Sequence, residues 1–201
     1  MNSKKHRYLS LRYRVLSDLD AMLDKRLTYH TVGHTLDVCN ACNQYIRRLD
    51  LPQHERLILR TAALLHDYGF TVTYSKHEKA GCKLISNMLP EYGYSKGEIE
   101  QIKKMILATQ IPQNPKDELS KILCDSDLDY LGRNDFKKIG DTLFQEFKNY
   151  GILKTRKSWN ELQAKFLKVH YYHTPYAQKY RQPVKQAHLK KVEALLSKNS
   201  G

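Results

Sequence analysis

The sequence predicts an all-α protein, a bundle of roughly seven to nine helices given typical helix lengths of ~11 residues. Three observations lead to this prediction. Apolar residues recur at three- and four-residue spacing in one segment after another. No segment alternates convincingly between apolar and polar residues, as a half-buried strand would. Capping residues and helix-ending Pro and Gly residues lie between the periodic segments.

The first three helices follow from this apolar periodicity. We expect one helix over residues 7–26, a second from His34 onward and a third over residues 52–67, where a proline opens the helix. If the second helix already includes His30, its imidazole points the same way as that of His34, because residues four apart share a helix face.

Capping residues and helix breakers divide the middle of the chain. A loop over residues 68–75 precedes a short helix that Pro90 ends. Ser95 and Glu98 form an S-x-x-E capping box at the start of the next helix. Prolines then break the chain, and residues 119–130 are expected to be helical.

The C-terminal part continues the helical pattern. Asn134 is expected to cap one helix, and Ser158 and Glu161 to form a second capping box. We expect a core over residues 1–150 and a basic helical extension over residues 151–201 that packs on the same domain.

The composition indicates a globular protein with no membrane association. Hydrophobic residues make up 41% of the chain, and no apolar run approaches the ~20 residues of a membrane span. The basic N-terminus is not followed by an apolar segment, so we expect no secretory signal and a cytoplasmic location. Cys39 and Cys42 form a C-x-x-C pair without a second pair. They are expected to be reduced core thiols, with a zinc or redox pair as the alternative.

Positive charge is concentrated near the C-terminus. The net charge is +13, and residues 137–198 hold 14 Lys and Arg against 4 Asp and Glu, a local net charge of +10. Either this part binds an anionic partner, such as nucleic acid or a phosphorylated substrate, or it is a solvated helical surface.

A histidine and an aspartate end a strongly apolar helix. His66 and Asp67 follow the run Thr61–Leu65, which belongs in a core, and burial of such groups without a partner costs about 2–7 kcal/mol. A hydrogen bond between them or a bound metal ion would supply the partner. His34 and an aspartate from residues 125–129 lie on other predicted helices. Two imidazoles and two carboxylates suit a divalent ion such as Mn, Fe, Co, Ni or Zn.

The order H…HD…D, carried on helices between Tyr29 and Arg133, resembles the HD superfamily of metal-dependent phosphohydrolases. The resemblance implies that His34, His66 and Asp67 are metal ligands. Its closing motif is Asp125-Ser126-Asp127-Leu128-Asp129. There the resemblance favours Asp127 as the fourth ligand over Asp125, with Asp129 as a structural residue.

The resemblance also implies roles for residues beside the ligands. Tyr29-His30-x-x-x-His34 is similar to a stretch of the cyclic-nucleotide phosphodiesterases, in which the first histidine protonates the leaving oxygen. Thr31 stands where those enzymes have Asn, so His30 is either the general acid or a packing residue. Asp67 would take part in catalysis as well as in metal binding.

Lys76 and His77 are the candidate substrate-binding residues. In some HD hydrolases a histidine in this region binds a second metal or a phosphate oxygen, and the alternative here is an exposed helix start. Such two-metal members also have a histidine near the position of Ala108-Thr109. The absence of that histidine favours one tightly held metal, with a weaker Mg held through Asp67 as a further option.

Together these features predict a metal-dependent phosphohydrolase that acts on a nucleotide or another small phosphate ester. A water molecule activated by the metal would attack phosphorus, and both mono- and diesters fit. The alternative is a nucleotide-sensing or nucleic-acid-binding module without turnover, which would bind through residues 137–198. The sequence does not define the oligomeric state.

Overall fold

The structure is a computed structural model that describes residues 2–198. Between Asn2 and Lys198 it contains helices and no strand, so the all-α prediction is confirmed. The α-helices are α1 (Asn2–Met22), α2 (Val32–Arg48), α3 (Gln53–Leu65), α4 (His77–Met88), α5 (Lys96–Ala108), α6 (Glu118–Asp127), α7 (Phe136–Asn149), α8 (Arg156–Val169), α9 (Pro175–Tyr180) and α10 (Gln182–Lys198). The 3₁₀-helices are η1 (Tyr68–Thr71), η2 (Leu89–Tyr92) and η3 (Asp129–Gly132).

The helices group into two compact units. The first contains the residues up to Lys25 and His30–Asp127, and the second contains Arg26–Tyr29 and the residues from Leu128 onward. Each unit is described by itself below. The predicted division of the chain near residue 150 into a core and an extension stays a prediction.

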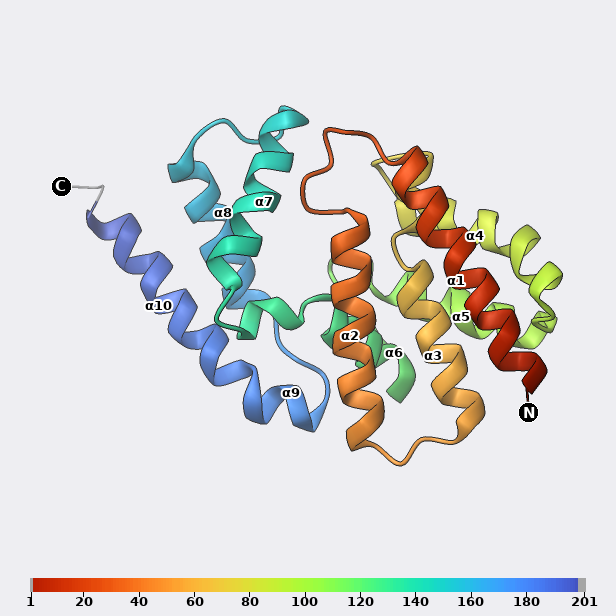
Figure 1. The fold of residues 1–201 in the computed structure, drawn as a ribbon. Coiled ribbons are helices and arrows are strands. Elements are labelled where there is room, and N and C mark those ends of the chain that lie inside the picture. Colours follow the sequence, from red (N-terminus) through yellow and green to blue (C-terminus); the bar gives the residue numbers. More distant parts are fainter. Residues whose placement is uncertain (1, 199–201) are drawn as a thin grey trace. The chain divides into compact units, whose positions relative to one another are not determined.

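Helix α3 is the central helix of the first unit. It packs against α1, α2, α5 and α6, and Figure 1 shows α2 and α3 side by side. Ile58, Leu59 and every residue from Ala62 to Leu65 are completely buried. Full burial of one Leu or Ile side chain contributes about 1.5–3 kcal/mol. This apolar run therefore anchors the end of α3 in the core and carries the next two residues, His66 and Asp67, into the interior.

The start of α4 crosses η1 at two glycines. A Cβ atom on Gly69 would lie 1.9 Å from the carbonyl oxygen of His77 and 2.7 Å from the backbone nitrogen of Gly81. Only glycine permits so close an approach of two backbones. The crossing brings the first residue of α4 next to the residues that follow Asp67.

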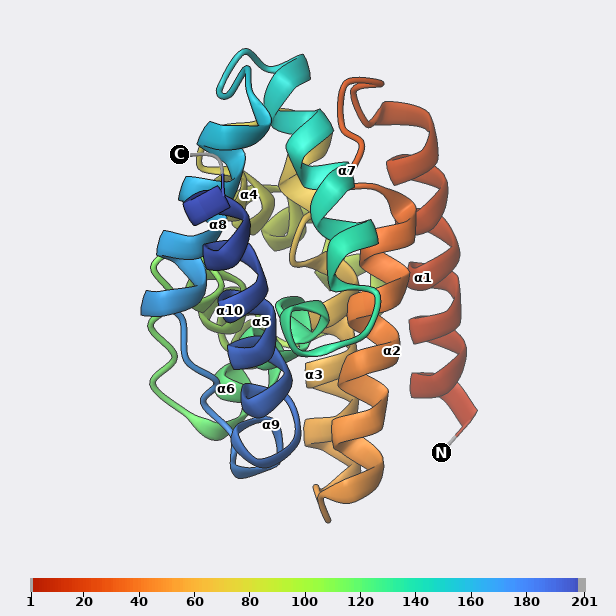
Figure 2. The same cartoon turned by 90° about the vertical axis from the view of Figure 1, so that its left-hand side faces the viewer.

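The second unit is held together by buried polar groups as well as by helix packing. Figure 2 shows α10 running beside α8, and α10 also packs against α9 and η3. Glu146 of α7 is completely buried and accepts hydrogen bonds from the backbone N–H groups of Thr28 and Tyr29 (3.1 and 2.9 Å). The guanidinium of Arg181 donates to the carboxylate of Asp129 (2.7 Å). These bonds join segments that are far apart in the sequence.

One predicted capping box is confirmed and the other is wrong. At the start of α5, the Ser95 hydroxyl accepts from the Glu98 N–H group and the Glu98 carboxylate accepts from the Ser95 N–H group. Helix α8 begins earlier than predicted, at Arg156. Thr155 is its N-cap, and the Thr155 hydroxyl accepts from the N–H group of Ser158 (3.1 Å). Ser158 therefore lies inside the helix and does not cap it.

Three other predicted helix boundaries differ from the structure. The first helix ends at Met22, four residues earlier than predicted. Asp135 rather than Asn134 precedes α7, and its side chain makes no capping hydrogen bond. The helix predicted over residues 119–130 ends at Asp127, after which the chain tightens into η3. Short 3₁₀ turns of this kind are frequent at the ends of α-helices, and apolar periodicity does not distinguish them.

The four cysteines lie in the first unit, and all are buried free thiols. Burial raises the pKa of Cys39 to about 12 and raises the pKa of Cys42 still further. Reactive thiols have lowered pKa values, and no third metal-ligating side chain from residues 7–197 joins this pair. Both thiols are therefore ordinary core residues.

Two further features of the described residues concern the tryptophan and the character of the helices. Trp159, the single tryptophan, is buried in α8 of the second unit, where its ring packs against that of Phe144 (centroids 5.8 Å apart). In the described part of the chain, no helix combines the length and the apolar character needed to cross a bilayer.

Candidate metal centre

His34 enters the site from the first turn of α2. The helix begins at Val32, and the hydroxyl of its N-cap, Thr31, accepts a hydrogen bond from the N–H group of His34 (3.4 Å). His30 therefore lies outside the helix, and the two histidines do not share a helix face. Their rings meet edge to face instead, with centroids 5.8 Å apart.

His66 enters the site from the end of α3, with one ring nitrogen already engaged. The Nδ1 atom of His66 lies 2.8 Å from the carbonyl oxygen of Ala63. A carbonyl only accepts hydrogen bonds, so Nδ1 carries the proton and donates it. In the neutral ring, the lone pair of Nε2 is therefore free for another partner. A backbone carbonyl bound to the second nitrogen is the usual way in which proteins orient a metal-ligating histidine.

Four acceptor atoms converge at this point. The Nε2 atom of His66 lies 3.3 Å from Nε2 of His34, 3.2 Å from Oδ2 of Asp67 and 3.6 Å from Oδ1 of Asp127. The Nε2 atom of His34 lies 3.4 Å from the same Asp67 oxygen and 3.3 Å from the same Asp127 oxygen. Even without Asp67, the ligand atoms of His34, His66 and Asp127 all lie within 4.8 Å of one another.

The spacing of these atoms fits a bound divalent ion. Ligand bonds of about 2.0–2.2 Å at tetrahedral angles place neighbouring ligand atoms about 3.4 Å apart, and the observed separations are 3.2–3.6 Å. Within residues 2–198, the buried Oδ2 atom of Asp67 accepts no hydrogen bond. Two imidazoles and two carboxylates are donors for ions such as Mn, Fe, Co, Ni or Zn. The residues present therefore fit a metal centre.

The electrostatics of the cluster also favour a cation. Burial by itself lowers the pKa of His66, but the carboxylates of Asp67 and Asp127 outweigh it and raise that pKa to about 9. Burial by itself raises the pKa of Asp67, but His66 and His77 outweigh it and hold that pKa well below its usual range. The cluster therefore has a negative potential that attracts positive charge.

The two substrate-binding candidates lie differently with respect to this cluster. The Nε2 atom of His77 lies 3.3 Å from Oδ1 of Asp67 and 3.6 Å from Oε1 of the buried Glu78. Lys76 has left-handed backbone angles (φ 56°, ψ 36°) immediately before α4, and its side chain is exposed. In the described part of the chain, no hydrogen bond or ion pair joins the Lys76 side chain to the cluster.

An aromatic stack connects His30 to His77. The ring of Phe70 lies parallel to both imidazoles, with its centroid 4.2 Å from that of His30 and 3.9 Å from that of His77. Phe70 is buried although it lies in a segment expected to be a loop. Neither Phe70 nor Glu78 was among the residues predicted for the site. The available signal was an aromatic residue three positions after Asp67.

The three aspartates of the closing motif have different surroundings. Asp127, at the end of α6, reaches the cluster. Asp125 lies two residues earlier, so it is on a different face of the helix, and it is completely buried. Asp129 belongs to the second unit and pairs with Arg181 (2.7 Å) and Arg133 (3.5 Å).

Comparison with known proteins agrees with this geometry. Residues 31–129 match the family model of the HD domain. A curated protein of Clostridium beijerinckii, described as an uncharacterized protein, is 32% identical over 87 residues, and the match covers 42% of this chain and 55% of that protein. The chain thus spans about half the length of this relative. Residues 31–129 therefore form an HD domain, the domain that the H…HD…D pattern of the sequence resembles.

Proposed function

We propose that the chain hydrolyses a nucleotide or another small phosphate ester with the help of a divalent metal ion. The convergence of acceptor atoms from His34, His66, Asp67 and Asp127 carries this proposal. An ion held by these residues supplies Lewis acidity, which polarises a phosphoryl oxygen and lowers the pKa of water. The side chains would hold this chemistry in a largely buried site, since His34, His66 and Asp67 are all buried.

His30 is the proposed proton donor to the leaving oxygen. Its ring lies between the edge of His34 and the face of Phe70, outside α2. An imidazole can hold and release a proton near neutral pH, as a general acid must. The alternative is that His30 only packs against Phe70.

His77 and Lys76 are the proposed phosphate contacts. His77 lies beside Asp67, and the Lys76 ammonium is exposed at the adjoining position. Both side chains can donate hydrogen bonds to phosphate oxygens, and charge-assisted bonds of this kind are strong. A weaker second ion such as Mg, sharing Asp67, is an alternative use of the same residues.

Metal analysis followed by a substrate panel tests the proposal. The metal content of the purified full-length chain would be measured first. Nucleoside mono-, di- and triphosphates and cyclic nucleotides would then be incubated with added Mn, Co, Ni or Mg, and product would be measured. We expect about one transition metal per chain and metal-dependent release of phosphate or nucleotide. A chain that retains no metal and releases no product in any combination contradicts the proposal.

Variants of the cluster link the metal to the assigned residues. We expect His66→Ala and Asp67→Ala to lose the metal. His54→Ala on α3 and Asp20→Ala on α1 are matched controls, because both side chains are exposed outside the site. Retention of wild-type metal content by His66→Ala or Asp67→Ala would show that the assignment of ligands is wrong.

A second candidate function rests on the charge of the second unit. Lys157, Lys165 and Lys190 are exposed and have no acidic partner within residues 2–198. Such lysines can bind the phosphate backbone of nucleic acid through residues 137–198. Tight RNA binding that weakens steeply with salt, in a chain without phosphatase activity in any metal, favours this candidate over the hydrolase.

A further inference from the structure

The 3₁₀ turn that follows Asp67 is tied to α1 by the side chain of Tyr68. The hydroxyl of Tyr68, the first residue of η1, donates a hydrogen bond of 2.6 Å to Oδ2 of Asp18 on α1. This length is typical of a charge-assisted bond from a hydroxyl to a carboxylate. Tyr68 is only 8% exposed, so its ring lies inside the first unit. The bond therefore holds the start of η1 against α1.

The carboxylate of Asp18 is itself held by a neighbour on α1. The Nε atom of Arg14, one turn earlier, lies 2.9 Å from Oδ1 and 2.8 Å from Oδ2 of Asp18. The Arg14 side chain is 59% exposed, and exposed ion pairs contribute little to the stability of a fold. The pair instead orients the carboxylate, so that Oδ2 faces the Tyr68 hydroxyl.

The backbone hydrogen bonds of η1 do not fix the direction of the turn. The N–H group of Phe70, for example, donates to the carbonyl of Asp67 (3.0 Å), which closes the turn on itself. The direction depends on contacts with other elements. These contacts are the backbone crossing with α4 at Gly69 and the bond from Tyr68 to Asp18.

Phe70 is the residue through which the direction of η1 affects the site. It lies two residues after Tyr68, and its ring stacks on the imidazoles of His30 and His77 with interplanar angles of 26° and 20°. Protein interiors are closely packed, so a shift of the Phe70 ring either moves these imidazoles or leaves a void beside them. The bond between Tyr68 and Asp18 thus acts on both histidines through Phe70.

We propose that Tyr68 and Asp18 are positioning residues of the metal centre, which set the place of Phe70 and, through it, of His30 and His77. The inference rests on the proposed function in one respect, because the two histidines affect turnover only if they contact the substrate. The other proposed ligands besides Asp67 lie on or at the ends of α2, α3 and α6. Loss of the bond should therefore leave the metal content unchanged.

The first measurement follows the two histidine rings without metal or substrate. Protons of an imidazole stacked on a benzene ring resonate upfield, because the ring current of the benzene ring shields them. In the metal-free full chain labelled with ¹³C-histidine, Tyr68→Phe should move the signals of His30 and His77 towards the position of an exposed histidine such as His54. Asp18→Ala should move them in the same direction.

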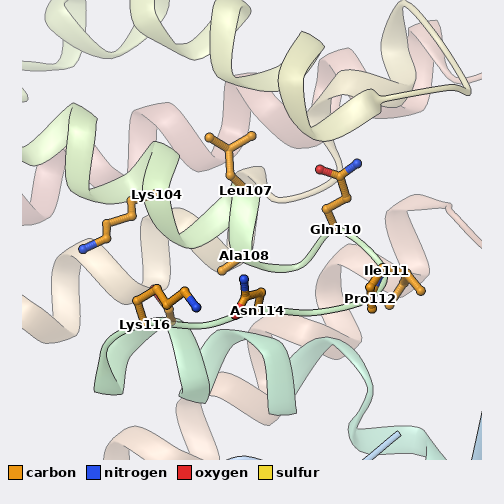
Figure 3. A pocket seen from close by; sticks show the side chains of 9 residues that line it. Lys104, Leu107, Ala108, Gln110, Ile111, Pro112, Asn114 and Lys116 are labelled. Carbon is orange, nitrogen blue, oxygen red and sulfur yellow. The ribbon is translucent and has the colours of Figure 1, made fainter. Parts of the chain in front are cut away.

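Tyr94→Phe is the matched control for Tyr68→Phe. Tyr94 is also 8% exposed and belongs to the first unit, and its hydroxyl lies 2.7 Å from that of Thr61. Removal of this hydroxyl should leave the signals of both stacked histidines unchanged. The backbone signals of Asn114 and Lys116 are a further reference. These two residues are exposed and line a surface cleft of about 390 Å³ between the end of α5 and the start of α6 (Figure 3).

Two further variants test whether the hydrogen bond itself is responsible. Asp18→Asn keeps an oxygen that can accept from the Tyr68 hydroxyl, so it should shift the histidine signals less than Asp18→Ala does. The double variant Tyr68→Phe/Asp18→Ala should shift them no further than either single change, because both changes remove the same bond.

Activity separates this inference from the proposed function. On a substrate identified by the panel, Tyr68→Phe should lower kcat/KM about tenfold at unchanged metal content, less than the roughly 100-fold loss from misplacing a catalytic group by about 1 Å. A wild-type chain without product contradicts the hydrolase, and the histidine signals then decide the positioning role alone. Unchanged signals in Tyr68→Phe, equal shifts in Tyr68→Phe and Tyr94→Phe, or an unchanged kcat/KM of Tyr68→Phe in an active enzyme would each overturn the inference.

Discussion

His66 illustrates how a single backbone contact prepares a side chain for chemistry. Donation from Nδ1 to the Ala63 carbonyl orients the ring and leaves the Nε2 lone pair directed at His34, Asp67 and Asp127. The contact is local, since Ala63 lies three residues earlier on α3. The tautomer of His66 is therefore a consequence of where α3 ends.

The aspartate assignment gives the first prediction. We expect Asp127→Asn to lower metal affinity about 100-fold or more, because the amide that replaces the carboxylate is a neutral and weaker ligand. Asp125→Asn should retain the metal, since the Asp125 side chain is not in the cluster. Calorimetric titration of the metal into the metal-free chains measures both values. Loss of affinity in Asp125→Asn alone would reverse the assignment.

Phe70 gives a second prediction for the proposed activity. Phe70→Leu removes the ring on which both His30 and His77 stack. We expect kcat to fall about 10- to 100-fold, the effect of misplacing catalytic groups by about 1 Å, while the metal content is retained.

Phe136→Leu is the matched control for Phe70→Leu. Phe136 is equally buried, and it stacks on His188 in the second unit (centroids 4.5 Å apart). Phe136→Leu should lower the free energy of unfolding by a similar amount but leave kcat unchanged. An unchanged kcat in Phe70→Leu would show that the stack has only a packing role.

At the scale of elements, the crossing of η1 and α4 determines where His77 lies. The two backbones meet at Gly69 and Gly81 without intervening side chains. Any atom added at the crossing moves the start of α4, and with it His77, away from Asp67. The start of α4 is therefore positioned by backbone contact, whereas side chains such as Ile85 pack further along the helix.

The crossing predicts a large difference between two Gly→Ala changes. Gly69→Ala should lower the free energy of unfolding by about 3 kcal/mol, as overpacking of a core does. Gly97→Ala on α5 should leave it unchanged or raise it by up to about 1 kcal/mol, because no atom lies within 4 Å of the added methyl group and alanine favours the helix. Urea denaturation of both variants measures the difference. Equal free energies of unfolding for Gly69→Ala and Gly97→Ala would show that the two backbones at the crossing can move apart without cost.

The sequence predicted which segments are helical more reliably than it predicted the residue at which each helix begins. Long apolar periodicity predicted that α2, α3 and α5 exist, because buried faces repeat at every turn. The start of α8 was missed because Thr155 and Ser158 are three residues apart and either hydroxyl can cap a helix. The position of Phe70 was beyond prediction, since it depends on the tertiary approach of η1 to α4.

At the scale of the whole molecule, the most unusual charge lies in the second unit. Lys185 of α10 is completely buried, and its ammonium donates to the carbonyl of His170 and lies 3.3 Å from Nδ1 of that ring. No carboxylate lies within ion-pair distance of it in residues 2–198. Burial lowers the pKa of Lys185 to about 8, and burial together with Lys185 lowers the pKa of His170 to about 3.

This lysine predicts how stability depends on pH. In the folded chain Lys185 releases its proton near pH 8, but in the unfolded chain it does so near its ordinary pKa of about 10.4. Between these values the unfolded state binds more protons, so this group adds stability as pH rises. At about pH 7, Lys185→Met should be about 1 kcal/mol more stable than the wild type, because a buried charge has been removed. That advantage should shrink towards about pH 10.

Thermal unfolding at several pH values measures the effect of Lys185→Met. The difference between variant and wild type is the useful quantity, because the buried thiols and tyrosines act in the opposite direction above about pH 9. Lys190→Met, an exposed change on the same helix, should show no pH-dependent difference. A constant difference between Lys185→Met and the wild type over this range would show that Lys185 is solvated.

The division of the molecule into units could not be predicted from local patterns. Arg26–Tyr29 belongs to the second unit because the backbone of Thr28 donates to Glu146, which is 118 residues away. No periodicity reports a contact over such a distance. Burial and chemistry indicated His34, His66, Asp67 and an aspartate from residues 125–129 as candidate ligands, whereas the choice of Asp127 among these aspartates depended on the family resemblance. Their roles as ligands stay a prediction.

The distribution of two rare residue types gives each unit its own spectroscopic or chemical reporter. The single tryptophan lies in the second unit, and all four cysteines lie in the first. Tryptophan fluorescence therefore follows the opening of the second unit alone, and the reaction of thiols with a colorimetric reagent follows the opening of the first. Folding of the two halves can be timed separately in the unlabelled, unmodified chain.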